Sequence, residues 1–146
     1  MKKDKSFKSC LAGFIKQIKP YSGFIFVSFI VVIFAVSSVP SIPTLKIKAG
    51  NSVIRLDYFF HFCEYGLLTF FALLSLSDND LKLKFNKLLI VLALLLAIAF
   101  LDELHQKIVP GRTYNIKDFI SNSSGVISGL IISSILFRHI RKKQVL

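Results

Sequence analysis

The sequence predicts an all-α membrane protein, a bundle of four transmembrane helices. Hydrophobic residues make up 53% of the 146 residues and the mean hydropathy is +0.64, too apolar for an ordinary soluble domain. Four apolar stretches can cross a hydrocarbon core of about 30 Å, which takes roughly 17–25 helical residues. Because unpaired backbone groups are costly in lipid, each stretch should be helical. The length fits one membrane domain over residues 1–146.

The segment before the first span has apolar residues at helical spacing with lysines between them. It is either an amphipathic helix at the membrane interface or an extension of the first span, and we expect it to be retained rather than cleaved as a signal peptide. The predicted spans cover approximately residues 21–39, 58–76, 85–101 and 119–137. The connection from Pro40 to Leu56 contains two prolines and a Gly-Asn pair, which favours extended or turn structure.

The distribution of positive charge predicts that both termini face the cytoplasm. The formal net charge is +11, and thirteen of the nineteen Lys and Arg residues lie before span one, between spans two and three, or after span four. Basic residues beside apolar stretches set topology and contact anionic lipids, so we expect no binding to nucleic acid. Cys10 and Cys63 have no CxxC spacing and are predicted to be reduced packing residues.

Acidic residues concentrate near the predicted outer ends of spans two, three and four. Five of the eight are found there: Asp57, Glu64, Asp102, Glu103 and Asp118. An ionisable group inside a span costs at least ~2.5 kcal/mol on insertion scales, so these carboxylates should be paired or face a cavity. We expect them to converge between the helices.

Span two carries a polar stripe. Asp57, His61 and the pair Glu64 and Tyr65 follow the i, i+4 and i+7 or i+8 spacing of one helix face. At 1.5 Å per residue, Glu64 should lie about 10 Å deeper in the membrane than Asp57. The stripe therefore descends from the outer surface.

Span four carries a second stripe, formed by Asp118, Asn122, Gly125 and Gly129. The two glycines lack side chains, so a neighbouring helix can approach closely there. We expect that neighbour to be span two or three.

The connection between spans three and four adds polar groups. Asp102 and Gln106 share a face by their spacing, and Pro110-Gly111 should end the helix. Arg112 follows directly, with a guanidinium that can grip a carboxylate of the protein or the phosphate of a ligand.

Three motifs run through these spans: D-x-x-x-H-F-x-x-Y from Asp57, D-E-x-x-Q-x-x-x-P-G-R from Asp102, and D-x-x-x-N-x-x-G from Asp118. Together they resemble the VanZ-like family, over roughly residues 52–136. The family is named for a bacterial plasma-membrane protein associated with low-level teicoplanin resistance in Gram-positive bacteria. The resemblance implies a cell-envelope protein that alters how a lipoglycopeptide reaches its cell-wall target. Where this chain has Tyr58 the family often has a lysine, so Arg55 or Arg112 would have to neutralise Asp57.

Three classes of function follow from these residues. The first is an outer-leaflet site that binds an anionic lipid or a lipid-linked cell-wall precursor, with Arg112 on the phosphate. Its candidate ligand-binding residues are Asp57, Tyr65, Asp102, Gln106, Arg112 and Asn122. The second is a membrane-embedded enzyme acting on a lipid-linked phosphate or acyl group, with candidate catalytic residues His61, Glu103 and Asp118.

The third class is a purely structural polar network, or a small transporter with Asp57, His61 and Glu64 as a proton ladder. A divalent metal would suit the enzyme, but no established zinc pattern is present. We expect no bound metal and no cofactor. The sequence leaves the oligomeric state open.

Overall fold

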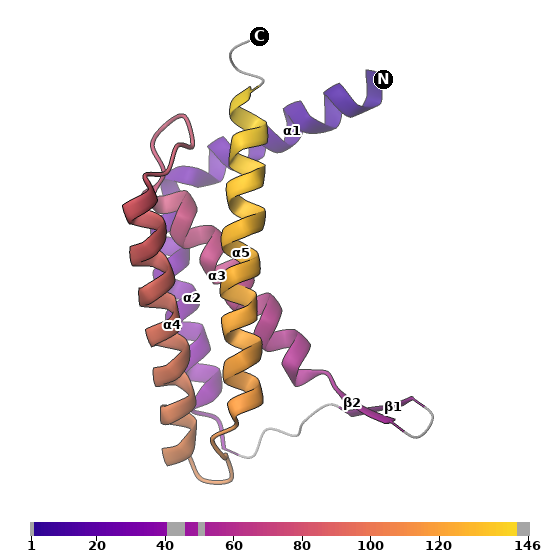
Figure 1. Cartoon of the computed structure of the whole chain (residues 1–146), viewed down its shortest axis with the longest axis vertical. Helices are drawn as coiled ribbons and strands as arrows, with labels where there is room; N and C mark the ends of the chain where they lie inside the picture. Colours follow the sequence, from indigo (N-terminus) through magenta and orange to yellow (C-terminus); the bar gives the residue numbers. More distant parts are fainter. Residues whose placement is uncertain (1, 41–45, 50–51, 143–146) are drawn as a thin grey trace.

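The computed structural model describes residues 2–40, 46–49 and 52–142 (Figure 1). In chain order the elements are α1 (Lys2–Ile18), the 3₁₀ turn η1 (Lys19–Tyr21), α2 (Ser22–Ser37), β1 (Lys46–Ala49), β2 (Ser52–Arg55), α3 (Asp57–Leu76), α4 (Phe85–Ile108) and α5 (Ile116–Lys142).

Four helical segments of the described chain are long and apolar enough to cross a membrane: Cys10–Ser37, Asp57–Leu76, Phe85–Ile108 and Ile116–Arg141. This confirms the predicted bundle and shows a multi-pass membrane protein. In Figure 1, α1 and the carboxyl end of α5 lie at one end of the bundle, and the β1–β2 hairpin and the α4–α5 turn at the other. The cytoplasmic placement of both termini stays a prediction.

The N-terminal segment is helical from Lys2, and α1 leaves the bundle at an angle to α2 (Figure 1). The bend lies at η1, where Pro20 occupies one of the first helical positions. Proline suits a first turn because that turn does not need its missing N–H. The helix is therefore as predicted, whereas its position at the membrane interface stays a prediction.

The connection between α2 and α3 contains a short antiparallel hairpin, in which Lys46 pairs with Arg55 and Ala49 with Ser52. This confirms extended structure there. Pro43 and the Gly50-Asn51 pair, which were part of the turn prediction, lie outside the described residues.

Helix α4 continues past the predicted end of the span at Leu101 to Ile108, just before the Pro110-Gly111 pair that was predicted to end it, so its last two turns carry the polar residues of the second motif. It ends there because Pro110 disfavours helical geometry at Val109, whose ψ is 128°. The Arg112 amide donates to the Val109 carbonyl oxygen at 3.1 Å, and Gly111 has φ 75°. Pro110 and the positive-φ Gly111 lie between the two residues that this hydrogen bond joins, which makes a type II turn. The turn fixes the position of Arg112.

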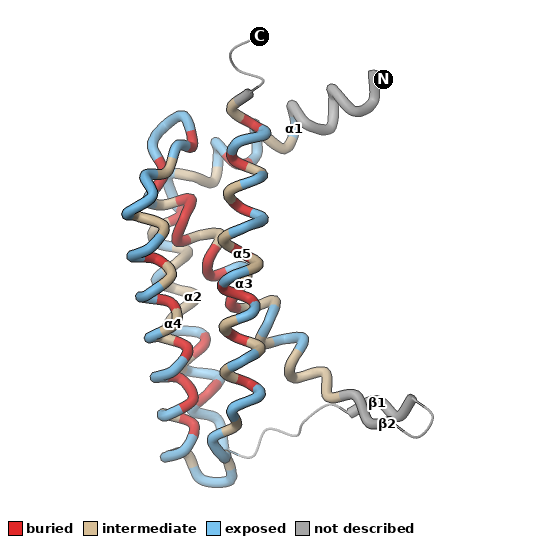
Figure 2. Tube along the Cα trace, in the orientation of Figure 1, coloured by how far each residue is buried: buried red, intermediate tan, exposed pale blue. Residues whose placement is uncertain are grey.

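Helices α3 and α5 pack most closely, through the glycine stripe. A Cβ on Gly125 would collide with the Phe62 carbonyl oxygen, and one on Gly129 would lie 2.8 Å from the Gly66 carbonyl oxygen. The predicted close approach is confirmed, and the neighbour is α3. Buried residues line the inner faces of the helices throughout the bundle (Figure 2).

Candidate functional site

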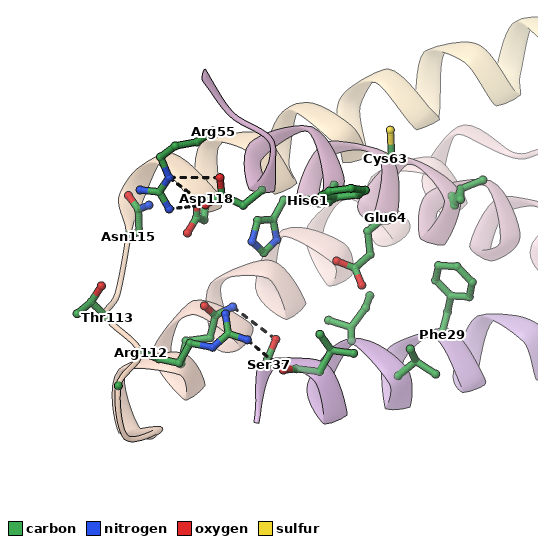
Figure 3. A pocket seen from close by; sticks show the side chains of 18 residues that line it. Phe29, Ser37, Arg55, His61, Cys63, Glu64, Arg112, Thr113, Asn115 and Asp118 are labelled. Carbon is green, nitrogen blue, oxygen red and sulfur yellow. Dashed lines mark hydrogen bonds and ion pairs between the residues drawn. The ribbon is translucent and has the colours of Figure 1, made fainter. Parts of the chain in front are cut away.

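A cavity of about 590 Å³ lies between α2, α3 and the turn before α5 (Figure 3). One wall is the apolar face of α2, made by Phe29, Val32, Ile33 and Val36. The opposite wall comes from α3 and includes Asp57, Phe60, His61, Cys63, Glu64 and Leu67. The remaining wall residues are polar or lie in the turn: Ser37, Arg55, Gln106, Gly111, Arg112, Thr113, Asn115 and Asp118. The cavity therefore joins an apolar surface to a charged end.

Asp57, at the first turn of α3, is held by Arg55. The Arg55 Nε donates to both carboxylate oxygens, at 3.0 and 3.2 Å, and Nη2 completes the ion pair. The guanidinium also lies over the Tyr58 ring, 4.7 Å from its centroid. The hydrogen bonds to Asp57 raise the pKa of Arg55. Of the two cations considered for neutralising Asp57, Arg55 does so.

Arg112 ties the α4–α5 turn to the carboxyl end of α2. Its Nε donates to the Val39 carbonyl oxygen at 3.2 Å, and its Nη2 donates to the Val36 carbonyl oxygen at 3.1 Å. These oxygens belong to the negative end of the helix dipole, which favours a cation. Arg112 thus closes the protein's own network through backbone carbonyls, and it also lines the cavity.

Gln106 joins α4 to α2 at the edge of the cavity. Its Nε2 donates to the Ser37 Oγ and to the Asp102 Oδ2, both at 3.4 Å. Gln106 and Ser37 are buried, 3% and 5% exposed. The end of α2 is therefore part of the site, although the sequence placed the site on spans two to four alone.

A second group of predicted site residues lies behind the cavity wall, between α3, α4 and α5. Tyr65, Asp102, Glu103 and Asn122 are at most 1% exposed and do not line the cavity. One Glu103 oxygen accepts a hydrogen bond from the backbone N–H of Asn115 at 3.4 Å, which anchors the turn before α5. Several polar atoms of this group have no hydrogen-bond partner among the described residues: the other Glu103 oxygen, the Asp102 Oδ1, the Tyr65 hydroxyl and both side-chain amide atoms of Asn122.

His61 and Asp118 belong to the cavity wall and also carry open hydrogen-bonding capacity. The His61 Nδ1 and one Asp118 oxygen are buried and have no partner among the described residues. Imidazole and carboxyl groups are the usual side chains for general acid and base catalysis.

Sequence reasoning left several wall residues out of the predicted site. Arg55 was considered only as a partner of Asp57 and not as a site residue, whereas the α2 wall carries only a generic apolar signal. Across the part of the chain that the structure describes, no group of three or more His, Cys, Asp or Glu side chains is placed to hold a metal ion.

All of these site residues lie within a region that matches a known protein family. A family model described as VanZ/LLP1 matches residues 16–138, which include α2 to α4 and most of α5. No curated protein and no solved structure matches the chain.

Proposed function

Because the chain belongs to the VanZ/LLP1 family of membrane proteins, we propose that its cavity binds the head group of an anionic amphiphile. The ligand class is an anionic membrane lipid or a lipid-linked cell-wall precursor. We further propose that the site faces the outer leaflet, and that occupancy alters how a lipoglycopeptide such as teicoplanin reaches its cell-wall target.

The observation that carries this proposal is the two-sided lining of the cavity. The α2 wall offers Phe29, Val32 and Ile33 to an acyl chain, and the opposite end carries two guanidinium groups, that of Arg112 and that of Arg55, which is paired with Asp57. About 590 Å³ lies in the usual range for small-molecule pockets, roughly 300–1,000 Å³. Arginine suits phosphate because its planar donors can engage two oxygens at once.

Charge reversal at Arg112 tests the binding. Arg112→Glu should lower the affinity for phosphatidylglycerol by about tenfold or more, because a charge-assisted hydrogen bond is replaced by repulsion. Native mass spectrometry of the detergent-purified protein, titrated with phosphatidylglycerol, measures the bound fraction. Arg138→Glu is the matched control, since Arg138 is exposed at the other end of α5. Unchanged binding and unchanged teicoplanin susceptibility of expressing cells, in a folded Arg112→Glu variant, would overturn the proposal.

A second candidate function is catalysis on a lipid-linked phosphate or acyl group. The observation in its favour is that His61 and Asp118, both in the cavity wall, hold buried atoms with no partner among the described residues. Such groups can act as acid and base on a bound substrate. The test is turnover of radiolabelled lipid precursors by the purified protein. His61→Gln should abolish turnover and retain binding, whereas the absence of turnover by the unaltered protein argues for binding alone.

A further inference from the structure

Glu64 lines the cavity further along α3 than the end at which we propose that phosphate binds. Its carboxylate extends from α3 into the space opposite α2 (Figure 3). The wall around it has apolar residues, Phe29 and Ile33 on α2 and Leu67 one turn further along α3, with His61 one turn earlier. A carboxylate inside a membrane span is costly unless a proton or a cation neutralises it.

No protein cation serves that purpose among the described residues. Arg55 is paired with Asp57, and Arg112 donates to carbonyl oxygens at the end of α2. His61, one turn earlier on α3, also lines the cavity, and no ion pair joins it to Glu64 among the described residues. The cavity therefore has its arginines at the mouth, together with Asp57 and Asp118, and an acid without an ion-pair partner deeper in the membrane.

We infer that Glu64 binds the ammonium group of the ligand, so the cavity takes a phosphate amphiphile that also carries a primary amine. This inference rests on the proposed function. The phosphate stays at the mouth with Arg112, and the amine enters on a flexible arm. Glu64 lies about 10 Å along α3 from Asp57, at 1.5 Å per residue, so the arm must span a comparable distance. An ammonium donates to a carboxylate as a charge-assisted hydrogen bond, which is strongest away from water.

The test compares two lipids with the same tails and phosphate, lysyl-phosphatidylglycerol and the same lipid with its amines acetylated. Native mass spectrometry gives the affinity of each for the detergent-purified protein. The unaltered protein should bind the amine form about tenfold more tightly, and Glu64→Gln should make the two affinities equal. Glutamine keeps the size of the side chain, so the fold should be retained. Asp80→Asn, which removes an exposed acid from the α3–α4 connection, should keep the preference.

The outcomes separate this inference from the proposed function. If both lipids bind without preference, or if Glu64→Gln keeps the preference, the ammonium site is wrong while head-group binding stands. If neither lipid binds, both proposals fail. Arg112→Glu tests head-group binding alone, because it should weaken binding of the acetylated lipid, which has no ammonium for Glu64.

Discussion

The two halves of the bundle treat buried polar groups differently. In the half toward α1, buried hydroxyls bond to the backbone of their own helix: Thr69 donates to the Tyr65 carbonyl at 2.7 Å and Ser77 to the Leu74 carbonyl at 2.8 Å. In the half toward the hairpin, Tyr65, Glu103 and Asn122 are fully buried and keep atoms without a partner among the described residues.

This contrast bears on the hypothesis of a purely structural network. Helix association in lipid relies on packing and on satisfied hydrogen bonds, and the half toward α1 meets both needs. A network kept only to hold helices together would gain nothing from open donors and acceptors, since each costs free energy when buried. Two residues with such open atoms, His61 and Asp118, line the cavity, which supports a role toward a ligand.

The largest expected effect is in the half toward α1. Leu73 is 0% exposed in the middle of the packed core, so Leu73→Ala should lower the free energy of unfolding by about 2–5 kcal/mol. Denaturation of the purified protein in mixed micelles measures it. Leu94→Ala is the matched control, because Leu94 is 48% exposed and should lose far less. Equal losses of unfolding free energy at the two positions would contradict the burial of Leu73 in the core.

Substitution at the α3–α5 contact should cause the next largest loss of stability. All three nearest atoms to a Cβ on Gly125 are backbone atoms of α3, which cannot rotate away. Gly125→Ala should therefore cost about 1–3 kcal/mol of stability, as overpacking does. Gly23→Ala adds the same methyl group where the nearest atom is 3.9 Å away, and its stability should be unchanged or higher. If Gly125→Ala is as stable as Gly23→Ala, the two helices do not pack as described.

A substitution in the half toward the hairpin should have the opposite sign. Asn122 is 0% exposed, and neither of its amide atoms has a partner in the described structure. Asn122→Leu keeps a similar volume and removes the unpaired groups, so unfolding should cost the same or about 1 kcal/mol more. A marked loss of stability would instead favour the structural network.

The sequence predicted the spans and their polar stripes because both depend on local periodicity. Asp57, His61 and Glu64 share a cavity wall since helical spacing alone puts them on one face. The last turns of α4 lie outside the predicted span because they are polar and span length was judged by apolarity, but their helical spacing and the end of the helix before Pro110-Gly111 were predicted. Their burial depends on contacts that the chain makes elsewhere.

Other parts of the site could not be predicted because they depend on tertiary contacts. The α2 wall is an apolar face like any other in the sequence, and only the crossing of α2 with α3 makes it part of a cavity. The split of the motif residues into a cavity wall and an interior group has the same origin. Tyr65 follows Glu64 in the chain, yet Tyr65 is fully buried away from the cavity while Glu64 lines it.

The smallest expected effect is at the mouth of the cavity, where the Arg55–Asp57 pair is partly open to solvent. The two side chains are 32% and 19% exposed, so Arg55→Gln should lower stability by no more than about 1 kcal/mol. The loss should shrink further in high salt, because ions screen exposed charges. The measurement is denaturation at low and high NaCl, with Lys82→Gln, whose pair with Asp80 is more exposed, as the control. A loss of several kcal/mol that salt does not reduce would mean that Asp57 is buried with the interior group. Asp57 would then not lie at the mouth of the cavity.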